Sequence, residues 1–153
     1  MASSMLPVAT HCEHIGTRLV DLRVGDLLTV KARRTVTDFD SVAMSVLAMN
    51  THPLHTDYAY ARSTPFGEPL VVSPFLLSTL VAFVVNELRE VEIDALEITE
   101  VSFERPVHPG DTITGEARVE EITPQRMRFL VAGKNASGEH FAQFRLAVSV
   151  HPV

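Results

Sequence analysis

The sequence predicts an α+β domain in which an antiparallel sheet of about five strands wraps around one long, buried helix. One segment, 75–88, is apolar on nearly all sides and contains no helix breaker, which is typical of a helix buried in a core. Four segments with strand-like patterns and intervening turn signals follow it, and one precedes it. A sheet wrapped around a single helix buries the apolar surface of both.

The length and composition fit one globular domain over residues 1–153. The chain has 46% hydrophobic and 21% charged residues, which is enough apolar content for a real core. Its net charge of −6 argues against a nucleic-acid binder. No stretch reads as a secretory signal or a membrane span, and the single cysteine, Cys12, cannot form an internal disulfide. We therefore expect a cytoplasmic protein that binds neither nucleic acid nor membrane.

Residues 1–16 carry the least pattern. His11, Cys12 and His14 are potential metal ligands, but their spacing is too tight for a usual zinc site and no second cluster matches them. We expect a mobile or partly ordered extension here and no metal site.

Three elements are predicted before the long helix. A turn signal at Gly25 precedes a strand over 27–36, in which apolar residues alternate with charged ones. Residues 37–40 offer N-cap candidates for a helix over 38–48. A second, short helix is predicted over 57–62.

The long helix is expected to have Ser73 as its N-cap and Pro74 as its first residue, and to run to Leu88. The strands after it are close in sequence, which favours an antiparallel meander. An open sheet edge favours pairing with a second copy, so we expect a homodimer or a dimer-based oligomer. The four strands are predicted over 96–107, 111–122, 126–135 and 140–150.

A loop over 50–57 carries the densest polar chemistry. Pro53 restricts its backbone and disfavours both helix and strand. Loops that hold polar side chains against an apolar wall are common places for catalytic groups, although a surface loop rich in histidine by chance is the alternative. The polar residues are Asn50, His52, His55 and Asp57.

Two motifs resemble the signatures of the MaoC-like hydratases, a family with the hot-dog fold. The stretch from Phe103 to Ile113 resembles the family's pattern of an aromatic and a charged residue, Arg-Pro-Val, two variable residues, Gly-Asp-Thr and an apolar residue. The loop resembles Asp-x-Asn-Pro-aliphatic-His, followed after five residues by Ala or Ser. Its matching positions are Pro53, Leu54, His55 and Ala61.

The loop departs from the family pattern at three positions. Asn50 stands where the family has its catalytic Asp, His52 where it has Asn, and Met49 where Gly usually precedes the Asp. In this variation the loop resembles a subgroup similar to mesaconyl-CoA (β-methylmalyl-CoA) hydratases.

The resemblance implies reversible hydration of a 2-enoyl thioester carried by CoA or by an acyl-carrier protein. It implies no cofactor beyond the CoA or phosphopantetheine of the substrate. His55 is the expected general acid and base, with Asn50 positioning the water. Asp57 is an alternative source of a carboxylate, although a helix cap is the favoured role for it. His52 is expected near the substrate or as a structural support of the loop.

The thioester carbonyl needs hydrogen-bond donors, which the start of the long helix offers at the backbone of Ser73, Phe75 or Leu76. Ser73 serving only as an N-cap is the alternative. Walls of an acyl cleft are sought among Phe39, Met44, Met49, Tyr58, Tyr60 and Phe66, and phosphate contacts among Arg62, Arg105 and Arg126.

Two other functions share the fold. A chain without the family's carboxylate is also suited to binding an acyl thioester or a partner without turnover. A thioesterase is disfavoured by the Pro-Leu-His spacing of the loop. The acyl chain, the carrier and the physiological direction of the reaction stay open.

Overall fold

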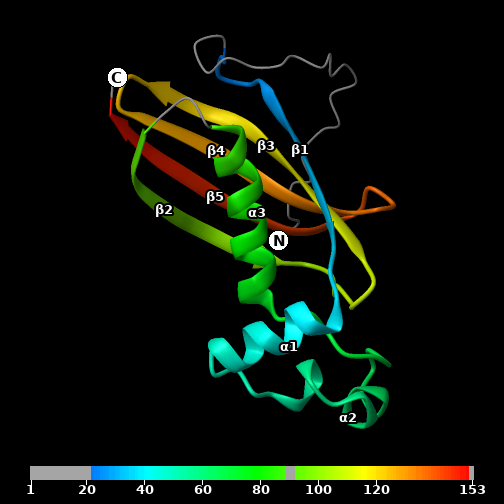
Figure 1. Cartoon of the computed structure of the whole chain (residues 1–153). Helices are drawn as coiled ribbons and strands as arrows, with labels where there is room; N and C mark the ends of the chain where they lie inside the picture. Colours follow the sequence, from blue (N-terminus) through cyan, green and yellow to red (C-terminus); the bar gives the residue numbers. More distant parts are fainter. Residues whose placement is uncertain (1–21, 89–91, 152–153) are drawn as a thin grey trace.

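A five-stranded antiparallel sheet curves around one long helix in the computed structural model, which describes residues 22–88 and 92–151 (Figure 1). The predicted hot-dog fold is confirmed. The residues 1–16 expected to form an extension lie outside the described residues, as does their cluster of potential metal ligands. The elements are β1 (Leu27–Thr35), α1 (Asp38–Leu47), the 3-10 helix η2 (Pro53–His55), α2 (Tyr58–Arg62), α3 (Ser73–Glu87), β2 (Glu92–Phe103), β3 (Thr112–Thr123), β4 (Arg126–Asn135) and β5 (His140–His151).

The order of strands in the sheet is β1-β3-β4-β5-β2, with every neighbouring pair antiparallel. The predicted meander is right for β3, β4 and β5 but wrong for β2, which pairs with β5 instead of β3. The β2–β3 connection, 104–111, contains Pro106 and Pro109 and is too long for a tight hairpin turn. It crosses to the other edge, where Val36 N–H donates to the carbonyl of Asp111 (2.8 Å).

The helices α1 and α2 lie together at the end of the sheet where α3 begins (Figure 1). α3 itself packs against β1, β3 and β4, and its buried side chains join the main core. No helix in the described ranges is long and apolar enough to cross a membrane.

Two glycines let α3 approach the sheet closely. Gly115 of β3 and Gly133 of β4 are paired, and Leu80 of α3 lies over both. A Cβ atom at Gly133 would lie 2.5 Å from Cζ of Phe141 and 2.8 Å from Cδ1 of Leu80. At Gly115 the nearest atom would be Cδ2 of Leu80, at 3.4 Å, which is ordinary contact.

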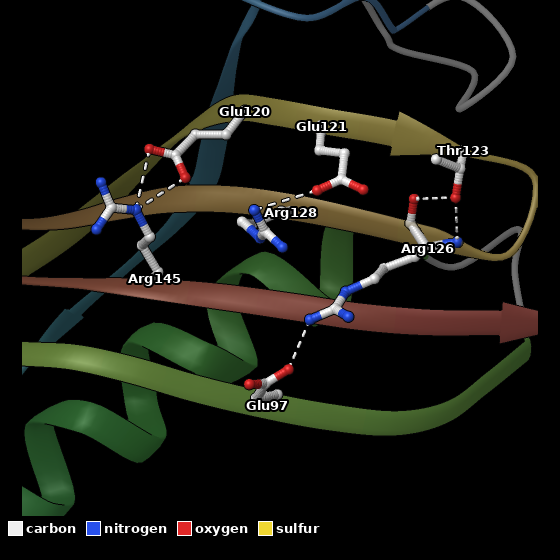
Figure 2. Close-up of polar contacts among 7 residues, drawn as sticks. All are labelled: Glu97, Glu120, Glu121, Thr123, Arg126, Arg128 and Arg145. Carbon is white, nitrogen blue, oxygen red and sulfur yellow. Dashed lines mark hydrogen bonds and ion pairs between the residues drawn. The ribbon is translucent and has the colours of Figure 1, made fainter.

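Ion pairs cross the face of the sheet that points away from α3 (Figure 2). Arg126 of β4 reaches over β5 to Glu97 of β2 (2.6 Å), and Arg145 of β5 reaches over β4 to Glu120 of β3 (3.0 Å). Arg145 also pairs with Glu100. These side chains are partly exposed, so each pair stabilises the fold modestly. Together they tie strand β2 to the middle of the sheet.

Strand β2 forms one edge and exposes an apolar row. The row consists of Leu96, Ile98 and Phe103. Their partners in β5 are the buried residues Val148, Leu146 and Ala142, in that order. The three residues of the row nevertheless keep 46%, 39% and 38% of their surface exposed. The expected dimer stays a prediction, and this row is the surface that it would cover.

The close approach at Gly133 gives a stability prediction. Gly133→Ala should lower the free energy of unfolding by about 2 kcal/mol, because the added methyl overlaps the ring of Phe141 and forces the core to shift. Gly115→Ala is the matched control and should change it by less than about 1 kcal/mol. Urea denaturation measures both, and an equal loss at the two positions would contradict the packing argument.

Candidate active site

The end of α1 places Asn50. Asn50 N–H donates to the carbonyl of Ser45 (2.9 Å) and Met49 N–H to that of Val46 (3.2 Å), which is the hydrogen-bond pattern of a Schellman cap. Met49 occupies the left-handed position of this cap, with φ of 54°. Glycine is the usual residue there because it has no Cβ. The Met49 side chain is 86% exposed, so packing within this chain does not compensate for the strained backbone.

The 3-10 turn η2 carries His55. His52 is its N-cap, with Nδ1 accepting a hydrogen bond from Leu54 N–H (3.2 Å), and Pro53 occupies the first helical position. His55 is half-buried, and its Nδ1 lies 2.9 Å from the carbonyl oxygen of Leu70. A carbonyl only accepts hydrogen bonds, so Nδ1 must carry the proton. In the neutral ring Nε2 is then the basic nitrogen.

Ser41 fastens the residues before α3 to α1. Its hydroxyl donates to the carbonyl of Leu70 (3.4 Å) and accepts from Val72 N–H (3.3 Å). Leu70 N–H in turn donates to the carbonyl of Leu54 (3.1 Å). The start of α3 is therefore held directly beside the turn that carries His55.

The start of α3 differs by one residue from the prediction. Val72 is the N-cap, Ser73 is the first helical residue and Pro74 the second, and no side chain caps the helix. Proline is tolerated throughout the first turn, so its position alone did not fix the register. Phe75 N–H donates to the carbonyl of Val72 (3.0 Å). Among the described residues, Ser73 N–H has no acceptor.

The phenyl ring of Phe75 packs against Arg34. Its centroid lies 5.3 Å from the guanidinium carbon of Arg34, a cation–π contact. With its N–H already bonded to Val72, Phe75 is a weaker donor to a substrate than Ser73.

His52 and Asp57 both cap short helices. Asp57 Oδ1 accepts from Ala59 N–H (2.8 Å) and Tyr60 N–H (3.0 Å), so the carboxylate is the N-cap of α2. These contacts agree with the helix cap that the sequence favours as the role of Asp57. The His52 ring meets the rings of His55 and Tyr60 edge-on, with centroids 6.2 and 5.9 Å apart. His52 thus lies next to His55, while its Nδ1 is already bonded to Leu54 N–H within the turn.

Two of the arginines sought as phosphate contacts are paired elsewhere. Arg126 lies at the β3–β4 turn and binds Glu97 on the outer face of the sheet (Figure 2). From the register, the far end of β3 is about 35 Å from α1, given roughly 3.3 Å per strand residue. Arg105 pairs with Glu139 (3.2 Å), and both are exposed. Arg62 ends α2 as an exposed residue.

Two of the expected cleft walls point into solvent. Phe39 and Met49 are 79% and 86% exposed, so neither encloses a cleft within this chain. Met44 is half-buried. The remaining candidates, Tyr58, Tyr60 and Phe66, are exposed as well.

An acidic cap holds the start of α1. Asp40 and Thr37 form a capping box, in which Thr37 N–H and its hydroxyl donate to Asp40 Oδ2 (3.0 and 2.8 Å). Burial would raise the pKa of Asp40, but these hydrogen bonds and the Arg34 guanidinium outweigh it and lower the pKa. Tyr58 OH donates to Asp38 Oδ1 (2.6 Å), which raises the pKa of Tyr58.

Three side chains in this region were missed by sequence reasoning, namely Ser41, Ser45 and His108. Ser41 and Ser45 are fully buried on α1, and the Ser45 hydroxyl has no partner among the described residues. The spacing of four between Ser41 and Ser45 was the available signal, because it places both on one face of α1. His108, whose ring bonds to the carbonyl of Pro69 (3.0 Å), was seen only as a variable motif position.

Comparison with known proteins now decides the family. The model of the MaoC like domain matches residues 22–140, which include the His55 loop and the 103–113 motif. The chain belongs to the MaoC-like family. No curated protein matches it by sequence.

Solved structures support this assignment. A monoamine oxidase regulatory protein from Archaeoglobus fulgidus superposes with a TM-score of 0.77 at 26% identity, covering 88% of this chain and 94% of the other. The R-hydratase PhaJ1 from Pseudomonas aeruginosa gives 0.73 at 20% identity over 88% and 85%. An (R)-hydratase from A. caviae gives 0.72 at 22% identity over 86% and 98%. The last two show the shared fold.

The strained cap predicts that Met49→Gly stabilises this MaoC-like chain. We expect a gain of about 0.5–1 kcal/mol in the free energy of unfolding, because glycine relieves the left-handed strain at the expense of some unfolded-state entropy. Met49→Ala is the control, since it removes the side chain but keeps the Cβ. Urea denaturation compares them, and equal effects would show that the strain is not what matters.

The capping box predicts an acid-dependent loss of stability. The pKa of Asp40 is lower in the folded chain than its ordinary value of 3.8. Its contribution is therefore present above about pH 4 and disappears as the pH falls through the folded pKa. Asp40→Asn should cost about 1 kcal/mol at pH 7 and less at pH 3, where the carboxylate begins to be protonated in the unfolded chain.

Urea denaturation at both pH values measures this difference. Glu68→Gln, at an exposed position, is the control and should be neutral at both. A penalty for Asp40→Asn that persists unchanged at pH 3 would rule out the charge as its origin.

Proposed function

We propose that this chain catalyses the reversible hydration of a 2-enoyl thioester, with His55 as general acid and base. The observation that carries the proposal is the bond from His55 Nδ1 to the carbonyl of Leu70, which leaves Nε2 as the basic nitrogen beside the start of α3. Family membership supports the reaction class. The substrate is proposed to be bound to CoA or to an acyl-carrier protein, with no separate cofactor.

Hydration adds the oxygen of water to C3 and a proton to C2. His55 Nε2 removes one proton from water as the oxygen attacks C3, and the C2=C3 electrons move toward the thioester carbonyl. The resulting enolate oxygen accepts a hydrogen bond from Ser73 N–H at the positive end of α3. The imidazolium then returns its proton to C2, so one proton is taken and one is given back.

Asn50 replaces the carboxylate that the family resemblance leads one to expect. Its carboxamide donates and accepts hydrogen bonds but does not take up a proton near neutral pH. We therefore assign Asn50 to orienting the attacking water. Asp57 does not substitute for the missing acid, because its carboxylate caps α2.

The proposed assembly is a homodimer formed through strand β2. Its support is the apolar row of Leu96, Ile98 and Phe103 at the sheet edge. A second copy pairing there would cover both the row and the unpaired backbone groups of the edge.

The decisive experiment separates the two roles of His55. His55→Asn keeps an N–H at about the position of Nδ1, so the bond to Leu70 and the stability should survive. It has no nitrogen equivalent to Nε2, and we expect turnover to fall by roughly 10²- to 10⁴-fold. His55→Ala loses both functions. Enoyl absorbance with crotonyl-CoA and mesaconyl-CoA, together with release of free thiol, measures the reaction.

Each outcome of this assay has a clear reading. Loss of enoyl absorbance without thiol release supports hydration, whereas thiol release indicates a thioesterase. Full activity in His55→Asn would remove His55 from the proton transfer. Binding of both thioesters by the wild-type chain without any turnover would favour the non-catalytic alternative, which the absence of a carboxylate at Asn50 motivates.

A further inference from the structure

We propose that His108 is a positioning residue for His55 and acts through the backbone of the 69–72 segment. The inference rests on the proposed function in its kinetic part only. Its basis is that two consecutive peptide groups of this segment each form hydrogen bonds through both the carbonyl oxygen and the N–H.

The first peptide group joins Pro69 to Leu70. Its carbonyl oxygen accepts from His108 Nδ1 (3.0 Å), and its N–H donates to the carbonyl of Leu54 (3.1 Å). A trans peptide points its C=O and N–H in opposite directions, so the two partners lie on opposite sides of the segment.

The second peptide group joins Leu70 to Val71 and is bonded in the opposite sense. Its carbonyl oxygen accepts from His55 Nδ1 (2.9 Å), and its N–H donates to the carbonyl of Val107 (2.8 Å). Each side thus presents the same pair of groups, a backbone carbonyl followed by a histidine Nδ1. Leu54 and His55 form one pair, and Val107 and His108 form the other.

The two sides differ in what holds them. His108 N–H donates to Asp111 Oδ2 (2.8 Å), and Asp111 N–H donates back to the carbonyl of His108 (3.1 Å). Gly110 N–H then binds the carbonyl of Val36 (2.7 Å), which fastens this turn to the end of β1. His55, by contrast, sits on a short 3-10 turn between exposed residues. The rigid side is therefore that of His108.

This difference gives His108 its role. Its bond fixes the plane of the Pro69–Leu70 peptide, and that plane sets the direction of the Leu54 contact on the other side. The adjoining Leu70 carbonyl, which orients the His55 ring, depends on the same backbone torsions. Without the His108 donor, the Pro69 carbonyl loses its partner and the acceptor of His55 loses one of its supports.

The test uses three variants of the full chain. His108→Ala removes the donor, and His108→Asn restores an N–H at about the distance of Nδ1. His140→Ala is the control, because His140 is a half-buried histidine that faces Glu116 on the sheet, away from this segment. The readouts are kcat and KM for crotonyl-CoA hydration and the ¹⁵N NMR shifts of the His55 ring, which report its tautomer without any substrate.

We expect His108→Ala to lower kcat about tenfold with little change in KM, since misplacing a catalytic group by a fraction of an ångström has effects of this order. The His55 ¹⁵N shifts should move away from those of a fixed Nδ1–H tautomer. His108→Asn should recover both to within about threefold of wild type, and His140→Ala should match wild type.

Three results would overturn the proposal. One is an unchanged His55 tautomer and an unchanged kcat in His108→Ala. Even with a lower Tm, this result would mean that His108 only stabilises its own turn. Another is equal impairment in His108→Ala and His108→Asn, and the third is an effect of the same size in His140→Ala. If the alanine variant does not fold, His108→Leu replaces it, having the shape of asparagine without a donor. If no variant or wild type turns over, the proposed function fails, while the NMR comparison still decides this inference.

Discussion

The hydrogen bonds of the 69–72 segment are the constraint on which the site depends. An extended segment buried between a sheet turn and a helical loop must satisfy its own backbone groups. Here the partners come from α1 through Ser41, from η2 through Leu54 and His55, and from the β2–β3 turn through Val107 and His108. The same residues lead into α3. The position of the helix N-terminus and the orientation of the His55 ring are therefore set by one set of contacts.

The helices and strands were predictable because their signals are local. The all-round apolar pattern identified α3, and the alternating segments identified β3, β4 and β5 within a few residues of their ends. The partner of β2 was not predictable in the same way, since strand pairing depends on the path of the connection. The two prolines of the 104–111 connection were the available signal against a hairpin.

The candidate site residues could be named from the sequence, whereas most of their contacts could not. The proline-centred loop pointed to His55, and the favoured role of Asp57 as a cap matches its hydrogen bonds. The acceptor of His55 is the backbone carbonyl of Leu70. Every residue has such a carbonyl, so the residue type does not indicate which one binds His55. The same reason hid His108. The register of Ser73 was missed because Pro74 fits either of the first two helical positions.

The three departures from the family pattern differ in their consequences for the loop. Met49 keeps the left-handed backbone that a glycine would adopt freely, and His52 accepts the Leu54 N–H with an imidazole nitrogen where the resemblance expects an asparagine. Met49 thus ends α1 and His52 caps the 3-10 turn, so both belong to the backbone turns on either side of Thr51. Asn50 alone changes its chemistry, because a carboxamide stands at the carboxylate position. In the proposed reaction no carboxylate at position 50 shares the proton transfer with His55, so the proton that leaves water and the proton that reaches C2 both pass through Nε2 of His55.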